Sequence, residues 1–320
     1  MGQLTRQDEQ AAQFKNLAGV LTSAAMRKQM AAALPKNITP ERLARVAMSA
    51  VQRTPKLLEC TPKSFLGCVM ACAALGLEPD GLLGQAYLVP FKVKGEMICT
   101  LITGYQGLIK LARNSGELIN IDAHPVRDGD KFSYRYGADP HIEHIPAERP
   151  FTRDELGGLV YDPAWRPGAI THFYAVAKLR DGSVSFVVMP TWEVNAIRDD
   201  SSGYKAAKEF GSESPWDTDY DRMGCKTAIR RLSKYLPASV EDNRLHRAVA
   251  LDERADRGIE QDFGAFVDLD GLPALEAMPA ASAPAPTVEN EGKRMSLRSN
   301  GDKKPPVVKV EGPNGEDMIK

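Results

Sequence analysis

A row of cations at regular helical spacing is the most informative chemical feature of this sequence. Lys226, Arg230 and Lys234 are four residues apart, and Arg231 flanks them. On a helix these side chains form one stripe beside an apolar seam, and such a stripe can follow the phosphates of a nucleic-acid backbone. Charged runs more often mark a solvated helix face, so charge alone favours that simpler interpretation.

A second polar cluster lies in the middle of the chain. Gln106, Lys110 and Arg113 project from the side of a short predicted helix opposite its apolar seam, and Arg127 and Lys131 flank the turn that follows the next predicted strand. A hydrated surface again explains these residues without a ligand. Two separate basic surfaces raise the expectation of an anionic ligand only modestly.

Aromatic residues near these cations could stack on nucleic-acid bases. Trp216 precedes the basic helix, and Tyr87 begins a predicted hairpin. Both could serve as stacking platforms. Burial as a hydrophobic anchor is the more common role for a tryptophan at a loop, and aromatic residues on strands more often pack a core.

Signals of enzymatic chemistry are few. The sequence has neither a P-loop nor a Gly-x-Gly-x-x-Gly motif, which disfavours ATP-driven chemistry. Asp217, Asp219 and Asp221 resemble a carboxylate cluster for Mg²⁺, so a metal-dependent nuclease is the alternative function. Acids at the start of a helix are also explained by the helix dipole. His141 and His144 are three residues apart on a strand or a loop, and on a strand this spacing would place them on opposite faces rather than around a metal.

Composition is that of a water-soluble protein with an uneven charge distribution. The 320 residues carry a formal net charge of −1, with +4 on residues 1–238 and −5 on the remainder. A mildly basic body fits a nucleic-acid partner without requiring one. The five cysteines show no metal-type spacing, and the sequence has no apolar run of membrane-spanning length. We therefore expect free thiols, no membrane segment and a cytoplasmic location.

Periodicity and capping residues predict an α+β fold. Thr39-Pro40 and Thr61-Pro62 mark two helix starts, and Asp181-Gly182 marks a hairpin turn. Hairpins favour a mainly antiparallel sheet. Helices are predicted from 40 and 62 and over 105–115, 191–198 and 218–236, and strands over 86–91, 97–103, 118–126, 131–136, 171–179 and 183–189, with long loops over 146–168 and 199–215.

The predicted domain organisation has three parts. Residues 1–35 are polar and weakly periodic, so we expect an N-terminal arm or a loosely docked helix. Residues 36–240 form the predicted body. Residues 241–320 are acidic and then Pro/Ala-rich, which predicts a mostly disordered tail.

Six blocks of the sequence, in this order and spacing, resemble the RecT family of phage recombinases. The blocks are 75–79 (LGLEP), 84–91 (GQAYLVPF), 101–116 (LITGYQGLIKLARNSG), 126–132 (VRDGDKF), 171–179 (THFYAVAKL) and 226–237 (KTAIRRLSKYLP). Each block alone would be a weak signal, and their agreement over roughly residues 30–240 makes the resemblance specific.

The resemblance implies a protein that binds single-stranded DNA and anneals complementary strands without ATP, through an annealed duplex intermediate. It also implies a ring or helical filament of copies, and the fold of annealing proteins, with a small antiparallel sheet on a central helix, N-terminal helices and a C-terminal basic helix. The implied partners are a phage 5′→3′ exonuclease and, as a further candidate, a host single-strand-binding protein. No cofactor is expected, and Mg²⁺ is considered as a modulator, since screening of the two phosphate backbones is enough to explain an effect on annealing.

Annealing requires that phosphates are held while bases stay available for pairing. We therefore expect Lys226, Arg230, Arg231, Lys234, Arg113, Lys110 and Lys131 to line a groove for DNA, with Gln106, Arg127, Tyr87 and Trp216 as further candidates. Arg231 lies nearest the far side of its helix and is alternatively expected in a salt bridge between subunits. A structural oligomer, whose basic faces contact acidic faces of neighbouring copies, is the third function considered.

Overall fold

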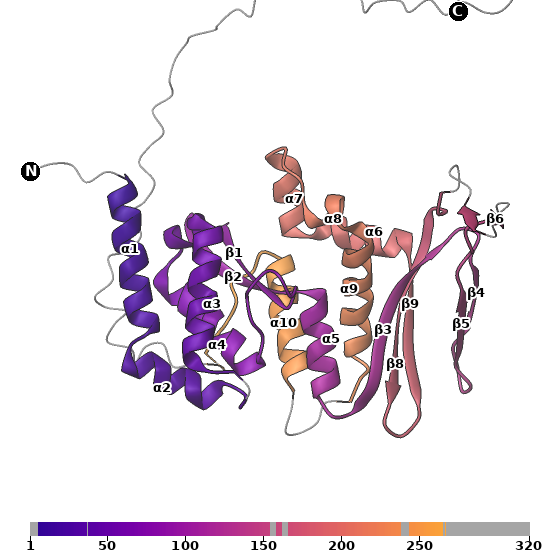
Figure 1. Cartoon of the computed structure of the whole chain (residues 1–320), viewed down its shortest axis with the longest axis horizontal. Coiled ribbons are helices and arrows are strands. Elements are labelled where there is room, and N and C mark those ends of the chain that lie inside the picture. Colours follow the sequence, from indigo (N-terminus) through magenta and orange to yellow (C-terminus); the bar gives the residue numbers. More distant parts are fainter. Residues whose placement is uncertain are drawn as a thin grey trace, which may run out of the picture. The chain divides into compact units, whose positions relative to one another are not determined.

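Helices and small antiparallel sheets alternate along the chain (Figure 1). The computed structural model describes residues 6–36, 38–153, 158–161, 166–237, 243–264 and 266, all of which belong to one compact unit, Met1–Ser282. The predicted α+β class with small antiparallel sheets is confirmed. Among the described residues, none of the helices combines the length and the apolar content that a membrane span requires.

The N-terminal segment is more ordered than an arm. Helix α1 (Arg6–Leu21) is followed by α2 (Ala24–Ala33), which Ser23 caps by accepting a hydrogen bond from Met26 N. Leu21, Met26 and Met30 are fully buried and belong to the main core. Residues 6–33 therefore pack on the body as two helices, because Met26 and Met30 recur at one helical turn.

The two predicted helix starts are confirmed. In α3 (Pro40–Arg53) and α4 (Pro62–Leu75), Thr39 and Thr61 accept hydrogen bonds from the third residue along, and proline occupies the first helical position. Gly76 ends α4 with a φ of 69°, as a glycine cap requires. A 3₁₀ turn, η1 (Pro55–Glu59), connects the helices. α4 is buried on nearly all sides, and it contacts the hairpin strand β2.

The first predicted hairpin is also confirmed. Strands β1 (Ala86–Val93) and β2 (Glu96–Thr103) pair antiparallel, with Ala86 opposite Thr103. The chain then enters α5 (Tyr105–Asn114), the helix predicted over 105–115. Its apolar side carries Leu108, Ile109 and Ala112 into the core, so Gln106, Lys110 and Arg113 are left on its outer side.

A three-stranded antiparallel sheet in the order β3-β8-β9 forms the second half of the fold. Its strands are β3 (Leu118–Arg127), β8 (Ile170–Leu179) and β9 (Val184–Pro190). All three contact helix α9. The other strands form separate hairpins: β4 (Lys131–Arg135) with β5 (His141–Ile145), and β6 (Phe151–Arg153) with β7 (Leu159–Tyr161). The predicted loop over 146–168 thus contains a short hairpin.

The C-terminal helices differ most from the prediction. Helix α6 (Thr191–Asp200) is followed by α7 (Ser202–Glu209) within the segment predicted as a loop. The predicted helix over 218–236 is instead α8 (Pro215–Thr218) and α9 (Tyr220–Ser233), separated at Asp219.

Helix α10 (Arg244–Asp256) lies within the predicted tail and buries Leu245, Ala248 and Val249. It packs against β2, α5, α4 and α9. The body therefore extends beyond the predicted boundary at 240. The predicted disorder of the remaining tail lies mostly outside the described residues.

Candidate nucleic-acid interface

The predicted DNA-binding stripe on α9 is buried at its centre. The Lys226 ammonium lies 2.9 Å from Asp252 Oδ2 of α10, and the exposed fractions of the two side chains are 7% and 1%. Arg230 is also buried and contacts both Asp252, at 3.2 Å, and Asp256. These two cations balance carboxylates inside the protein, so the structure does not place Lys226 and Arg230 in an open groove, and their contact with DNA stays a prediction that this geometry does not favour.

The outer part of the same stripe is paired with acids. Arg231 Nη2 lies 2.6 Å from Glu193 Oε1 of α6, and Lys234 Nζ lies 2.7 Å from Glu253 Oε1 of α10. Arg231 therefore makes its salt bridge within one chain, although both cations remain partly exposed.

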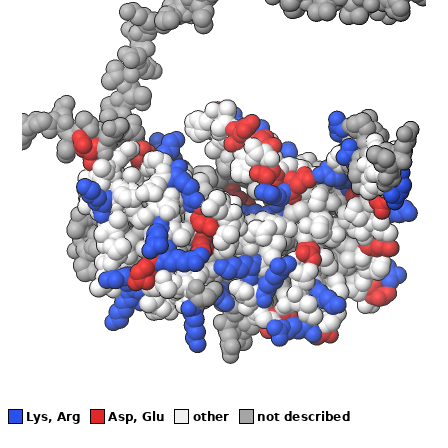
Figure 2. Space-filling model, viewed as in Figure 1, with Lys and Arg blue, Asp and Glu red and all other residues white. Residues whose placement is uncertain are grey.

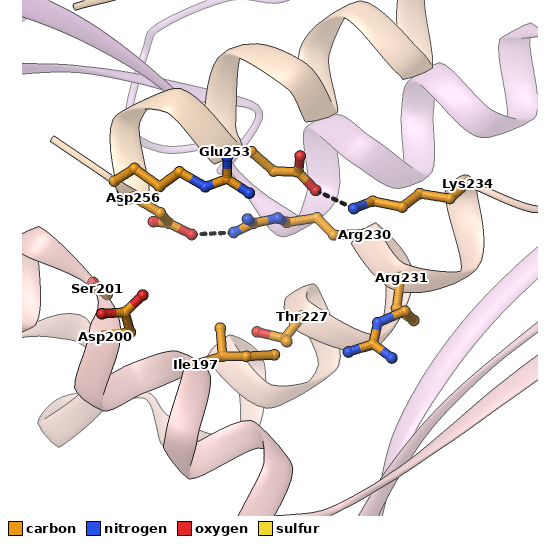
Figure 3. A pocket seen from close by; sticks show the side chains of 10 residues that line it. Ile197, Asp200, Ser201, Thr227, Arg230, Arg231, Lys234, Glu253 and Asp256 are labelled. Atoms are coloured by element: carbon orange, nitrogen blue, oxygen red, sulfur yellow. Dashed lines mark hydrogen bonds and ion pairs between the residues drawn. The ribbon is translucent and has the colours of Figure 1, made fainter. Parts of the chain in front are cut away.

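A pocket of about 280 Å³ lies between α6, α9 and α10, and Figure 3 shows the cations and acids that line it. The lining residues are Ile197, Asp200, Ser201, Thr227, Arg230, Arg231, Lys234, Glu253, Asp256 and Arg257. Four cations face three acids there. An anion that entered would compete with carboxylates already in place, so this pocket is a weak site for phosphate.

Trp216 anchors a loop instead of presenting a stacking platform. Only 7% of the residue is exposed, and its ring centroid lies 6.1 Å from that of Tyr220. It belongs to the main hydrophobic core. The commoner anchoring role therefore describes Trp216 in this structure, and its predicted contact with DNA gains no support from the geometry.

The three aspartates of the nuclease alternative are held by three different cations. Asp217 Oδ1 accepts from Lys208 at 2.8 Å, Asp219 lies 3.7 Å from Arg222, and Asp221 lies 2.5 Å from Arg127. The bond from Lys208, together with bonds from Ser214, lowers the pKa of Asp217 to about 2. Asp217 also completes a capping box with Ser214. Within the described residues no three potential metal ligands gather at one place.

The histidines behave as the strand periodicity predicts. On β5, His141 is exposed, whereas the His144 side chain is 8% exposed and bonds Asp130 Oδ2 at 3.0 Å. Burial opposes ionisation of Asp130, but hydrogen bonds from Ala147 N, Arg127 N and His144 outweigh it and lower the pKa of the carboxyl. This buried pair fastens the β4-β5 hairpin to the end of β3.

The second predicted cluster separates into two places. Arg127 sits at the far end of β3, where it bonds Asp221 and donates to Gly168 O at 3.2 Å. Lys131 is exposed on β4. Arg113 donates to Asn120 Oδ1 at 3.0 Å, and Asn120 lies roughly 23 Å from Arg127 at the rise of an extended strand. Arg127 and Lys131 therefore do not share a surface with α5.

The outer side of α5 keeps its predicted residues together. Gln106 and Arg113 are exposed, and Lys110 lies between them. Lys110 Nζ donates to Gly76 O at 2.8 Å and to Gln85 Oε1 at 2.9 Å, which holds the ammonium at the edge of the loop between α4 and β1.

Further cations from other elements surround this helix. Burial lowers the pKa of Lys110. Among its charged neighbours, Glu78 raises this pKa, whereas Arg244 and Arg42 lower it further. Arg42 is itself 2.5 Å from Glu78. Arg244 Nη1 lies 3.7 Å from where a Cβ on Gly76 would be, and the carbonyl of Gly76 is the one that Lys110 bonds, so these cations lie close together.

Arg53 joins the same region from α3. It donates to Pro79 O at 3.3 Å, and its guanidinium carbon lies 3.5 Å from where a Cβ on Gly81 would be. We name this region the α5 surface; its members are Arg42, Arg53, Glu78, Asp80, Leu82, Leu83, Tyr87, Gln106, Lys110, Arg113 and Arg244. Five cations meet two acids there, and Figure 2 shows Lys and Arg gathered over the region of α3, α4 and α5.

Close backbone contacts fix the loop against α5. A Cβ on Gly104 would lie 2.0 Å from Gly84 O, and one on Gly107 would lie 2.1 Å from Gln85 O. Only glycine permits these approaches. The predicted candidate Tyr87 follows the loop, is 40% exposed, and has its hydroxyl near Gly84. The glycines thus bring Tyr87, Gln106 and Lys110 to one place.

The structure adds residues that the sequence interpretation missed. Arg42 and Arg53 reach the surface from α3, and the loop exposes Leu82 and Leu83. Arg42 and Arg53 could not be assigned from helical periodicity, because their partners lie more than 20 residues away. Leu82 and Leu83 could have been identified from the sequence, since two adjacent leucines stand in a Gly-rich loop between two of the blocks that resemble the family. Cations around backbone amides and apolar groups can hold phosphates without reading base edges.

Comparison with known proteins identifies the family of this chain. The family model described as the RecT family matches residues 41–263. Protein RecT of Escherichia coli (strain K12) is 39% identical over 233 residues, which cover 72% of this chain and 77% of that protein. The uncharacterized protein YqaK of Bacillus subtilis (strain 168) is 26% identical over 262 residues, 80% of each chain. The match spans α3 to α10 and includes the whole α5 surface, so the chain belongs to the RecT family.

Proposed function

We propose that this chain is an ATP-independent protein that binds single-stranded DNA and anneals complementary strands in phage-type recombination. The match to the RecT family over residues 41–263 carries this proposal. It is supported by 39% identity to Protein RecT over most of the chain. The protein acts in the cytoplasm of a bacterial host, on strands supplied by a 5′→3′ exonuclease, in the proposed scheme.

The α5 surface is the proposed contact for the DNA backbone. Arg113 is exposed and carries only a hydrogen bond to Asn120 among its described contacts, so its guanidinium can exchange that bond for a phosphate. Lys110 lies one turn before Arg113 on the same helix, and its ammonium donates to Gly76 O and Gln85 Oε1. Arg53 and Gln106 extend the surface toward the loop. Phosphate contacts of this kind hold a strand without sequence preference.

Self-association into a ring or filament belongs to the same proposal. A strand longer than one surface must pass from copy to copy, and neighbouring copies would continue the row of cations. The scheme also includes binding of a host single-strand-binding protein. In this scheme Mg²⁺ modulates annealing by screening the phosphate backbones of the two DNA strands.

The decisive experiment follows annealing of two complementary fluorescent oligonucleotides without nucleotide, and checks strand length on a denaturing gel. We expect faster annealing with both strands intact. Shortened strands that require Mg²⁺ would instead support the nuclease alternative with Asp217, Asp219 and Asp221. Assembly without any binding of labelled DNA would support the purely structural oligomer.

A matched pair of variants tests the surface. Arg113→Ala should flatten the dependence of log affinity on log salt by about one unit, because one phosphate contact is lost. Arg222→Ala is the control, because Arg222 is an exposed arginine like Arg113 but lies on α9, where its neighbour is Asp219. Equal slopes for wild type and Arg113→Ala, with wild-type folding, would remove Arg113 from the interface.

A further inference from the structure

Two adjacent leucines at the tip of the loop between α4 and β1 are unusually exposed. Leu82 is 88% exposed and Leu83 is 51% exposed. Single exposed leucines are common on protein surfaces, but two in succession at a loop tip leave a continuous apolar area that the described residues cover only in part. Their position is therefore not explained by packing within the described residues.

The backbone holds these leucines in place. Asp80 Oδ1 accepts hydrogen bonds from Leu82 N at 3.1 Å and from Leu83 N at 3.0 Å. Gly81 and Gly84, on either side, have φ values of 71° and 62°, which favour glycine. The loop is thus a preformed projection, which lowers the entropic cost of binding.

The charges around the projection indicate what would cover it. Arg53 lies beside Gly81 on one side, and Lys110 bonds Gln85 on the other. Cations that flank an apolar tip match single-stranded DNA, in which phosphates flank the apolar faces of bases. A neighbouring protein surface would need acids placed on both sides of an apolar pocket, which is a more demanding match.

We propose that Leu82 and Leu83 form an apolar wedge that inserts between adjacent bases of a bound single strand, while Arg53 and Lys110 hold the phosphates on either side. Apolar side chains are known to enter base steps and unstack them partly. The inference rests on the proposed function, because it requires single-stranded DNA on the α5 surface. A wedge would divide the strand into short stacked groups with bases turned outward, ready for a complementary strand.

The test uses an oligonucleotide of stacked adenines that contains 2-aminopurine, whose emission rises when the base unstacks. At saturating full-length protein we expect a severalfold rise with wild type and no rise with the double variant Leu82→Ala/Leu83→Ala. We also expect about tenfold weaker affinity, with an unchanged salt slope because apolar contacts release no counterions. Leu82→Ala alone should fall between the two.

Phe210→Ala is the matched control, since Phe210 is 80% exposed but lies at the end of α7. It should behave as wild type. A full emission rise with the double variant would overturn the wedge, as would a changed salt slope. A change in the sedimentation of DNA-free protein would also overturn it, by assigning the leucines to contact between copies. If wild type fails to bind the oligonucleotide at all, the proposed function itself fails, and that result is distinct from the others.

Discussion

The buried ion network between α9 and α10 makes a strong prediction about stability. Asp252 is 1% exposed and lies within 3.2 Å of both Lys226 and Arg230. Its Oδ1 also accepts from Thr103 N of β2 at 3.1 Å. The substitution Asp252→Asn keeps the shape and removes the charge. Arg230 retains Asp256, but Lys226 loses the carboxylate that compensates its buried ammonium.

The expected cost is large because an uncompensated buried charge is expensive. Breaking such a pair from one side lowers the free energy of unfolding by about 3–5 kcal/mol. Lys226→Met should cost less, since Asp252 keeps Arg230 and the Thr103 amide. The double variant Lys226→Met/Asp252→Asn should recover part of the loss of Asp252→Asn, because no lone cation then remains at Lys226.

Urea unfolding at pH 7, followed by circular dichroism, measures all three variants. The salt dependence of single-stranded DNA binding is measured in parallel. We expect Lys226→Met to leave the salt slope unchanged, in contrast to Arg113→Ala. A loss below about 1 kcal/mol for Asp252→Asn would refute the role of the network in stability. A slope flattened by one unit in folded Lys226→Met would refute the inference that this lysine stays inside the protein when DNA is bound.

Three further predictions follow from buried groups away from the proposed interface. Trp216→Ala should lower the free energy of unfolding by about 3–5 kcal/mol through the cavity it leaves, with an unchanged salt slope in the folded protein, as urea titration and DNA binding can check. The lowered pKa of Asp130 means that its contribution to stability is present above the unfolded pKa of about 3.9 and is lost as pH falls through the lower folded value; acid unfolding of Asp130→Asn should therefore show less of this loss than wild type. The five cysteines are all buried, and burial raises the pKa of Cys225 to about 12, so a thiol reagent should label the native protein slowly and all five thiols only after denaturation.

Elements that carry their own signals could be predicted from sequence. Thr39 and Thr61 cap helices whose first residue is proline, and Gly76 ends a helix in the left-handed conformation. Local hydrogen bonds decide such features, so the residues nearby are sufficient to identify them. The hairpins at 86–103 and 170–190 were identified for the same reason, since a short turn fixes strand pairing.

Pairing decided by distant residues could not be predicted in this way. Strand β3 is followed by a short turn, but β4 pairs with β5, and β3 pairs with β8, more than 40 residues later. Helix α7 and the β6-β7 hairpin lie in polar, Gly-containing segments whose composition favours a loop. Tertiary contacts override weak local preference in such segments.

Exposure of side chains was predicted correctly where one helix has a single covered side. On α5 the apolar residues face the core, and nothing described covers Gln106 and Arg113, so the helical pattern placed both at the surface. The contribution of α3 to this surface was not predicted. Arg42 and Arg53 reach it through Glu78 and Pro79, and a contact between α3 and the loop after α4 depends on the whole fold.

The burial of the α9 cations was not predicted, for a specific physical reason. A helical pattern gives the angle of each side chain around its own axis, and it assigns the cations of α9 to a side away from the seam of Cys225, Ala228 and Ile229. That side would face solvent if the chain ended its body at Pro237. Instead α10 covers it and supplies Asp252 and Asp256, so the cations meet carboxylates within the core. A helix with an apolar seam and a cationic stripe therefore fits burial between two elements of its own fold as well as it fits a DNA-binding surface. The two cases differ in whether the element that covers the stripe supplies carboxylates, as α10 does here.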